Sequence, residues 1–107
     1  MASLSIQERK RLRQIGHALN PVVMIGDKGL TENVVEELNR ALNDHELIKV
    51  KVGAEDREAR SALITEIAEA TGAEVVQTIG KIALLYKKAA KQNQKLSNLV
   101  RFAHLSN

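Results

Sequence analysis

Apolar residues recur along the chain at two spacings, and each spacing predicts one kind of secondary structure. Recurrence every three to four residues indicates amphipathic helices, which we expect over residues 6–18, 32–43 and 56–71. Short β-rich or alternating runs indicate strands, which we expect over residues 22–25, 47–52, 74–79 and 82–86. The predicted order is therefore α-β-α-β-α-β-β.

Residue types at the ends of these segments support the predicted boundaries. Ser5 and Glu8 match a capping box at the start of the first helix, and Gly72 suits the C-terminal cap of the third. Only Gly80 and Lys81 separate the last two strands, which is typical of a two-residue hairpin with glycine first.

The predicted strands differ in the pattern of their two faces. Residues 22–25 are apolar without alternation, which predicts a strand buried on both faces. Residues 47–52 alternate, so Lys49 and Lys51 share one face and apolar residues the other. We expect an α/β sandwich in a single domain, with three helices against one mixed four-stranded sheet. The order of the strands does not follow from the sequence.

Positive charge is concentrated at the two ends of the 107 residues. Residues 1–20 contain four basic residues and one acidic residue, and residues 21–86 contain seven basic and twelve acidic residues. Residues 87–107 contain five basic residues and no acidic one. This distribution is typical of a protein that binds a polyanion, and it is equally typical of a solvated surface with a solubilising tail.

Residues suited to catalysis do not form a recognisable site. The chain has no cysteine, and none of its three histidines lies at metal-ligand spacing from another. Asp44, His45 and Glu46 have the chemistry of an acid/base cluster, but adjacent residues in a predicted turn more often cap and solvate. We therefore expect no enzyme activity, no metal, no cofactor and no small-molecule substrate.

The sequence has no recognisable secretion signal or membrane-spanning segment either. Residues 1–13 are polar and basic without an apolar run, and no stretch reaches the length of a membrane span. We expect a cytoplasmic protein that does not bind a membrane.

A Gly-x-x-Gly loop follows the first predicted strand and opens a helix. Gly26 and Gly29 lack a β-carbon, so the loop can take positive φ and a bulky group can approach its N–H donors. Lys28 adds a positive charge, and the amide groups at the start of the following helix would face the same space. The loop therefore suits a phosphate backbone, and the alternative is a structural strand-to-helix turn.

The scarcity of aromatic residues limits which kinds of nucleic-acid-binding domain fit this chain. Tyr86 and Phe102 are the only two, whereas sheets that stack bases need aromatic residues on their strands. Backbone recognition by the loop remains, in the way that KH domains clamp a backbone with a Gly-x-x-Gly loop. Here the loop lies between a strand and a helix, so the parallel covers chemistry and not fold.

Three segments carry a more specific signal. They read Leu-Arg-Gln-Ile-Gly-His-Ala-Leu-Asn-Pro-Val-Val-Met-Ile-Gly-Asp-Lys-Gly-Leu-Thr, then His-Glu-Leu-Ile-Lys-Val-Lys-Val, then Val-Gln-Thr-Ile-Gly-Lys. In this order, within residues 4–87, they resemble the CRM domain family (chloroplast RNA splicing and ribosome maturation) in its stand-alone bacterial form. The resemblance implies a fold akin to the C-terminal domain of bacterial translation initiation factor three. It also implies association with ribosomal RNA in precursors of the large subunit, and a role in their assembly.

On this reading the chain comprises an RNA-binding domain, residues 1–87, and a basic tail, residues 88–107, and acts as a monomer. The expected RNA contacts are Gly26, Asp27, Lys28 and Gly29 of the loop, with Arg9, Lys10, Arg13, Lys49, Lys51 and Lys81 around it.

The tail supports a second reading. Residues 87–94 are rich in Lys, Gln and Asn, which predicts a mobile segment. Leu96, Leu99, Val100 and Ala103 have helical spacing and would allow a helix to dock on a partner. The alternative function is thus a protein-interaction module that docks through its tail.

Overall fold

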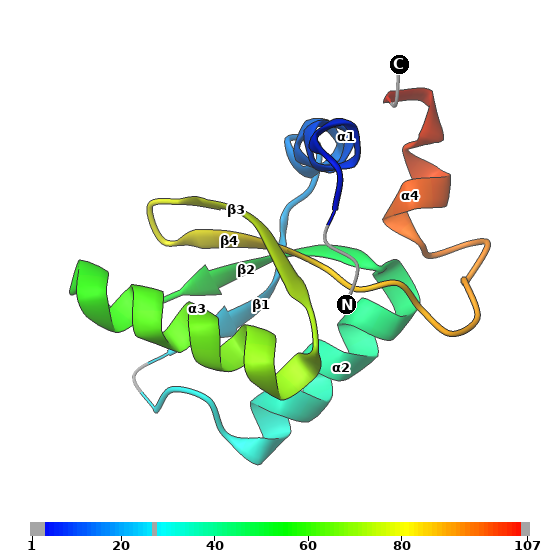
Figure 1. Ribbon diagram of the computed structural model, residues 1–107. Coiled ribbons are helices and arrows are strands. Elements are labelled where there is room, and N and C mark those ends of the chain that lie inside the picture. Colours follow the sequence, from blue (N-terminus) through cyan, green and yellow to red (C-terminus); the bar gives the residue numbers. More distant parts are fainter. Residues whose placement is uncertain (1–3, 27, 106–107) are drawn as a thin grey trace.

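The fold is a four-stranded sheet with helices on both faces (Figure 1), seen in a computed structural model that describes residues 4–26 and 28–105. The elements are α1 (Ile6–Gly16), β1 (Pro21–Ile25), α2 (Glu32–His45), β2 (Leu47–Val52), α3 (Arg57–Thr71), β3 (Glu74–Ile79), β4 (Ile82–Tyr86), α4 (Asn98–Arg101) and the 3₁₀ turn η1 (Ala103–Leu105). The predicted order and mixed α/β class are confirmed. Within the described residues, no helix has both the length and the apolar character needed to cross a bilayer.

Local sequence signals fix the ends of these elements. The Ser5 hydroxyl accepts from the Glu8 amide and the Glu8 carboxylate accepts from the Ser5 amide, so the capping box is present. Gly72 ends α3 with a left-handed φ of 74°, and Gly80 opens the β3–β4 turn with a φ of 56°. Both glycines occupy a region that side chains with a β-carbon rarely adopt.

The strand order is β1-β2-β4-β3, with β1 parallel to β2 and the other pairs antiparallel. This order brings three connections to one end of the sheet, because Ile25 pairs with Val52, Lys51 with Ile82, and Ile79 with Ile82. We call it the open end, made of residues 26, 28 and 29 after β1, residues 53–56 after β2 and the turn Gly80–Lys81.

The main hydrophobic core lies between the sheet and helices α2 and α3. Leu38 and Leu42 of α2 and Ile64 and Ile67 of α3 pack against one face of all four strands. The alternating residues of β2 supply the centre of this face, since they are almost completely inaccessible; they are Ile48, Val50 and Val52. The apolar residues that recur at helical and strand spacing in the sequence thus pack into one core.

A second, smaller core lies under α1 on the opposite face. Leu12 and Ile15 pack against Leu47, Val76 and Leu84. In Figure 1, α1 is seen end-on above the strands, and the β3–β4 turn projects beyond it. Helix α1 therefore covers only part of this face.

The predicted burial of β1 on both faces is wrong. Val22 is 50% exposed and Met24 is 67% exposed, while Val23 and Ile25 are buried. The physical reason is the strand order, which places β1 at the edge of the sheet while the second core lies under α1 on β2, β3 and β4. The apolar side chains of Val22 and Met24 are left on the surface.

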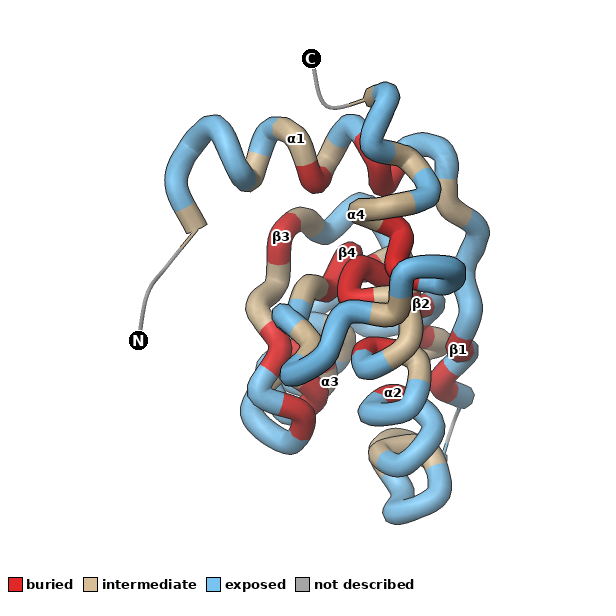
Figure 2. Tube along the Cα trace, turned by 90° about the vertical axis from the view of Figure 1, so that its right-hand side faces the viewer, coloured by how far each residue is buried: buried red, intermediate tan, exposed pale blue. Residues whose placement is uncertain are grey.

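The tail folds back onto the domain instead of forming the predicted mobile segment. Glu46 accepts hydrogen bonds from the Ala89 amide at 2.8 Å and the Gln92 amide group at 2.6 Å. Leu99 and Phe102 pack against the second core. Figure 2 shows α4 lying alongside the C-terminal part of α1. Of the apolar stripe expected to meet a partner, Leu99 is therefore used inside the molecule, while Leu96 stays 40% exposed.

Candidate nucleic-acid interface

The Gly-x-x-Gly loop is a tight turn with open space in front of it. The Gly29 amide donates to the Gly26 carbonyl at 3.0 Å, and Gly29 has a φ of 70° while Gly26 stays outside the left-handed region. A β-carbon built on either glycine would meet no atom within 4 Å. Thr31 caps α2, accepting from the Val34 amide at 3.2 Å. A ligand can thus reach the loop backbone, although Asp27 lies outside the described residues.

The neighbouring connections hold this loop in place. The Gly53 amide donates to the Ile25 carbonyl at 2.8 Å, and a β-carbon on Gly53 would lie 3.0 Å from that oxygen. The Val52 amide donates to the Lys81 carbonyl at 2.7 Å. Glycine at residue 53 therefore permits the close approach that ties the β2–α3 connection to the start of the loop.

The surface beside the open end consists of two rows of cross-strand neighbours. The first row is Met24, Lys51, Ile82 and Ile79, and the second is Lys49, Leu84 and Gln77. The five on β1, β2 and β4 point to the α1 side of the sheet, since the alternate residues of these strands enter the main core. Gln77 and Ile79 of β3 are the cross-strand partners of Leu84 and Ile82 and share their face. We call these seven residues the open face.

Most of the predicted lysines meet at the open end without internal partners. The side chains of Lys28, Lys49 and Lys51 form no hydrogen bond or ion pair with any other described residue. Lys81 pairs with Glu55 at 3.1 Å, but both side chains are well exposed. Such exposed pairs contribute about 0–1 kcal/mol, so Lys81 can exchange Glu55 for a phosphate at little cost.

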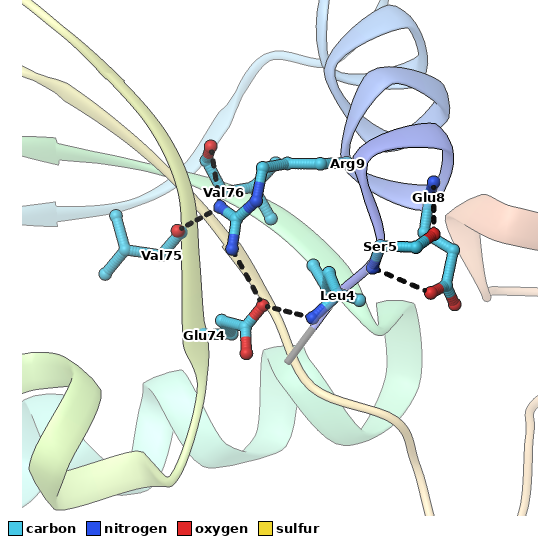
Figure 3. A network of polar contacts seen from close by, with 7 residues as sticks. All are labelled: Leu4, Ser5, Glu8, Arg9, Glu74, Val75 and Val76. Carbon is cyan, nitrogen blue, oxygen red and sulfur yellow. Dashed lines mark hydrogen bonds and ion pairs between the residues drawn. The ribbon is translucent and has the colours of Figure 1, made fainter. Parts of the chain in front are cut away.

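Arg9, in contrast, is used inside the fold (Figure 3). Its guanidinium donates to the carbonyls of Val75 at 3.0 Å and Val76 at 3.3 Å, and pairs with the Glu74 carboxylate at 3.1 Å. The same carboxylate oxygen accepts from the Leu4 amide. Because Glu74 begins β3, these bonds lie at the end of the sheet remote from the Gly80–Lys81 turn.

The other basic residues of α1 lie along the same helix. Lys10 is exposed and Arg13 is half-buried, and neither side chain bonds another described residue. Arg13 lies one turn before His17, which borders the open face beside Lys49 and Gln77. The structure thus places Lys28, Lys51 and Lys81 at or beside the open end, with Lys49 further along β2 on the same face as Lys51, and leaves Arg9 at the other end.

The candidate acid/base cluster supports the tail. The Ser97 hydroxyl donates to Glu46 at 2.8 Å, beside the bonds from Ala89 and Gln92, and the His45 Nδ1 lies 2.9 Å from the Leu96 carbonyl oxygen. Burial raises the pKa of Glu46, but these hydrogen bonds and the charge of Lys88 outweigh it and hold the pKa below the ordinary value of a glutamate. Within the range that the structure describes, no group of side chains is arranged to hold a metal ion.

Sequence reasoning missed the apolar members of the open face. Met24 and Ile79 are 67% and 61% exposed, although both occur in runs that looked like core strands. Their cross-strand pairing with Lys51 and Ile82 could not be derived without the strand order. The two lysines of β2 were the one signal in the sequence that this face is not fully covered.

Comparisons with known proteins agree with the fold. The family model described as CRS1 / YhbY (CRM) domain matches residues 4–87. A probable RNA-binding protein of Pseudomonas aeruginosa is 48% identical over 101 residues, covering 94% of this chain and 97% of that protein. An RNA-binding protein of Haemophilus influenzae is 47% identical, covering 90% and 97%. The solution structure of a Staphylococcus aureus protein, 30% identical, matches with a TM-score of 0.74 over 89% of this chain and 98% of that one.

Proposed function

The chain belongs to the CRS1 / YhbY (CRM) domain family, and from this premise we propose that it binds RNA through the open end of its sheet. One observation carries the proposal: an accessible Gly-x-x-Gly turn lies at the same end as lysines with no internal partner. Phosphate oxygens accept hydrogen bonds from backbone amides and from free lysine side chains. The names of the Pseudomonas aeruginosa and Haemophilus influenzae relatives support RNA as the ligand.

The RNA in our proposal is ribosomal RNA in precursors of the large subunit, and the protein is a cytoplasmic, monomeric assembly factor without catalytic activity. The support is the family resemblance carried by the three sequence segments. Recognition through backbone amides and lysines predicts affinity that falls steeply with salt and depends little on single-base changes. Lys28, Lys49, Lys51 and Lys81 would hold phosphates around Gly26 and Gly29.

The alternative of an interaction module gains no support from the tail. Leu99, Phe102 and Leu105 pack against α1 and the second core. Ser97 and Asn98 are buried and bonded to Glu46 and to the Leu47 carbonyl. A partner that takes the apolar side of the tail would first have to break these contacts.

Sedimentation of a cell extract through a sucrose gradient tests the proposal. The protein should co-migrate with a large-subunit precursor and move to the top after nuclease treatment. The variant Gly26→Ala with Lys28→Glu should stay at the top without nuclease. Gly26 is preferred to Gly29 because its φ admits alanine, so loss of binding would not reflect misfolding.

A matched control variant tests whether a change in net charge alone explains a loss of binding. Lys95→Glu changes the charge as Lys28→Glu does, but lies in the tail, where Lys95 is exposed. This variant should still co-migrate with the precursor. Wild-type protein that sediments as a free small species would contradict the ribosomal proposal, and equal retention of the loop variant would remove the loop from the site.

A further inference from the structure

We propose that the RNA is unpaired where it crosses the open end, and that its bases lie on the open face and in a hollow beside His17. This inference rests on the proposed function and adds the kind of RNA that the site takes. It comes from a feature that phosphate binding does not require, which is exposed apolar surface next to the free lysines.

The hollow has an apolar floor and a polar rim. Ile79, Ile82 and Leu84 line it from the sheet, and His17, Lys49 and Gln77 supply polar groups around it. Its volume is about 140 Å³. An apolar cavity of about 150 Å³ is known to hold a benzene ring, so the hollow has the size for a planar ring. A nucleobase has this character, with apolar faces and hydrogen-bonding edges.

The outer row of the open face extends this surface toward the loop. Met24 and Ile79 stand at its two sides with Lys51 and Ile82 between them. Isolated exposed apolar residues are normal, but here they form cross-strand neighbours at about 5 Å spacing around a lysine. A surface of this composition suits a ligand with apolar faces and a negative backbone, because each part of the ligand meets its complement.

The spacing of the strands allows one RNA strand to contact both the loop after β1 and the hollow. Neighbouring strands lie about 4.8 Å apart, so the loop after β1 and the hollow between β2 and β3 are separated by roughly 10–15 Å across the sheet. A few nucleotides span this distance. The backbone would lie on Gly26, Lys28 and Gly29 while the following bases reach Met24, Ile82 and Ile79.

Duplex RNA cannot make the same contacts. In an A-form helix the base faces are stacked, and the deep, narrow major groove keeps side chains from the base edges. A duplex would offer only phosphates and 2′-hydroxyls to the lysines. Because the open face carries aliphatic and not aromatic side chains, we expect base contacts weaker than stacking and with little sequence preference.

Three RNA probes of about 12 nucleotides test the inference by fluorescence anisotropy with the full chain. The first is an unpaired RNA, the second is the same backbone with abasic riboses at every position, and the third is a duplex. We expect the unpaired RNA to bind about five- to tenfold more tightly than the abasic probe, and more tightly than the duplex. Equal affinity for the unpaired and abasic probes would overturn the inference.

Two variants locate the base contacts. The double substitution Met24→Gln with Ile79→Gln should remove the preference for the unpaired over the abasic probe, while leaving affinity for the abasic probe unchanged. Ile6→Gln is the matched control, since Ile6 is 86% exposed but lies on the first turn of α1 away from the open face. A preference that survives the double substitution would overturn this placement of the bases.

The outcomes separate this inference from the proposed function. If wild-type protein binds none of the probes, the proposed function fails and the inference fails with it. If all three probes bind with equal affinity and the same dependence on salt, RNA binding stands and only the placement of bases is wrong. Thermal unfolding of each variant, followed by circular dichroism, shows that the substitutions leave the fold intact.

Discussion

The two ends of the sheet differ in whether certain basic side chains have hydrogen-bond partners within the molecule. At the end remote from the loop, which we call the anchored end, Arg9 bonds β3, Lys87 donates to the Thr71 carbonyl at 2.7 Å and Arg101 donates to Asn98 at 3.1 Å. At the open end, Lys49 and Lys51 have no partner among the described residues. These cations of the anchored end stabilise the fold, whereas Lys49 and Lys51 are available to a ligand. Arg60 also supports the open end, since it donates to the carbonyls of Ala54 and Glu55.

The comparison shows that local charge density alone does not locate a binding surface. Residues 87–107 are the most basic segment of the sequence, yet their hydrogen bonds and apolar side chains brace the anchored end. The acidic middle segment contributes Lys28, Lys49, Lys51 and Lys81, which converge only because of the strand order. An internal partner distinguishes Arg9, Lys87 and Arg101 from Lys28, Lys49 and Lys51.

The largest expected effect is on the anchored end. Glu46→Ala should lower the free energy of unfolding by about 2–4 kcal/mol, because it leaves three donors of the tail without their charged acceptor. Urea denaturation measures this loss. Affinity for RNA, measured well below the melting temperature, should change less than about twofold. A large loss of RNA affinity in the folded variant would tie the anchored end to binding.

Glu37→Ala provides the control for this stability measurement. Glu37 is an exposed residue of α2, whose side chain bonds no other described residue. Substitution there should change the free energy of unfolding by no more than about 0.5 kcal/mol. A similar loss in both variants would mean that the Glu46 contacts do not stabilise the fold.

Charge reversal at the open end should have the next largest effect. The double variant Lys49→Glu with Lys51→Glu should weaken RNA binding by about tenfold or more at low salt and reduce the slope of its salt dependence. Lys91→Glu with Lys95→Glu makes the same change in net charge on exposed tail residues. Anisotropy titrations should show a much smaller loss for the tail variant. Equal losses would mean that RNA responds to total charge and not to the open end.

Substitutions of Arg9 and Arg13 test separately for a role in stability and a role in RNA binding. Arg9→Ala should cost about 1–1.5 kcal/mol of stability, because it removes the bonds to Val75, Val76 and Glu74. Its effect on RNA affinity should be smaller than that of Arg13→Ala, since Arg13 has no described partner to lose. Paired denaturation and binding measurements check both statements. A reversed order of the two affinities would place Arg9 in the binding surface.

The smallest expected effect is a pH dependence of the anchored end. The pKa of Glu46 is lowered in the folded protein, so its stabilising contribution is fully present above the unfolded value near 4.3 and is lost as pH falls through the folded value. The stability difference between wild type and Glu46→Gln should therefore shrink as pH is lowered below about 4.3. Urea denaturation at a series of pH values measures it. A difference that grows in acid would mean that the pKa is raised instead.

Local structure could be predicted from the sequence because its causes are local. The capping residues Ser5 and Glu8 lie three residues apart, and Gly72 and Gly80 have the conformations that their positions required. The alternation of β2 correctly placed Lys49 and Lys51 on one face. These signals depend on backbone geometry within a few residues, which the sequence carries directly.

Contacts between distant segments were the part that could not be predicted. Arg9 was expected among the RNA contacts, but it bonds Glu74, which is 65 residues away in the sequence. Ser97 meets Glu46 across 51 residues, so the role of the Asp44–His45–Glu46 cluster could not be recognised. The exposure of Met24 likewise depends on which strand lies at the edge of the sheet. Each of these outcomes is set by tertiary packing and not by local pattern.

Amide chemical shifts during a titration with unpaired RNA test the central claim most directly. In ¹⁵N-labelled protein, the account predicts that shifts concentrate on Gly26, Lys28, Gly29, Lys51 and Ile79, while residues 89–101 stay unchanged. Shifts concentrated in the tail, with the open end unchanged, would contradict the account and make the anchored end the RNA-binding surface.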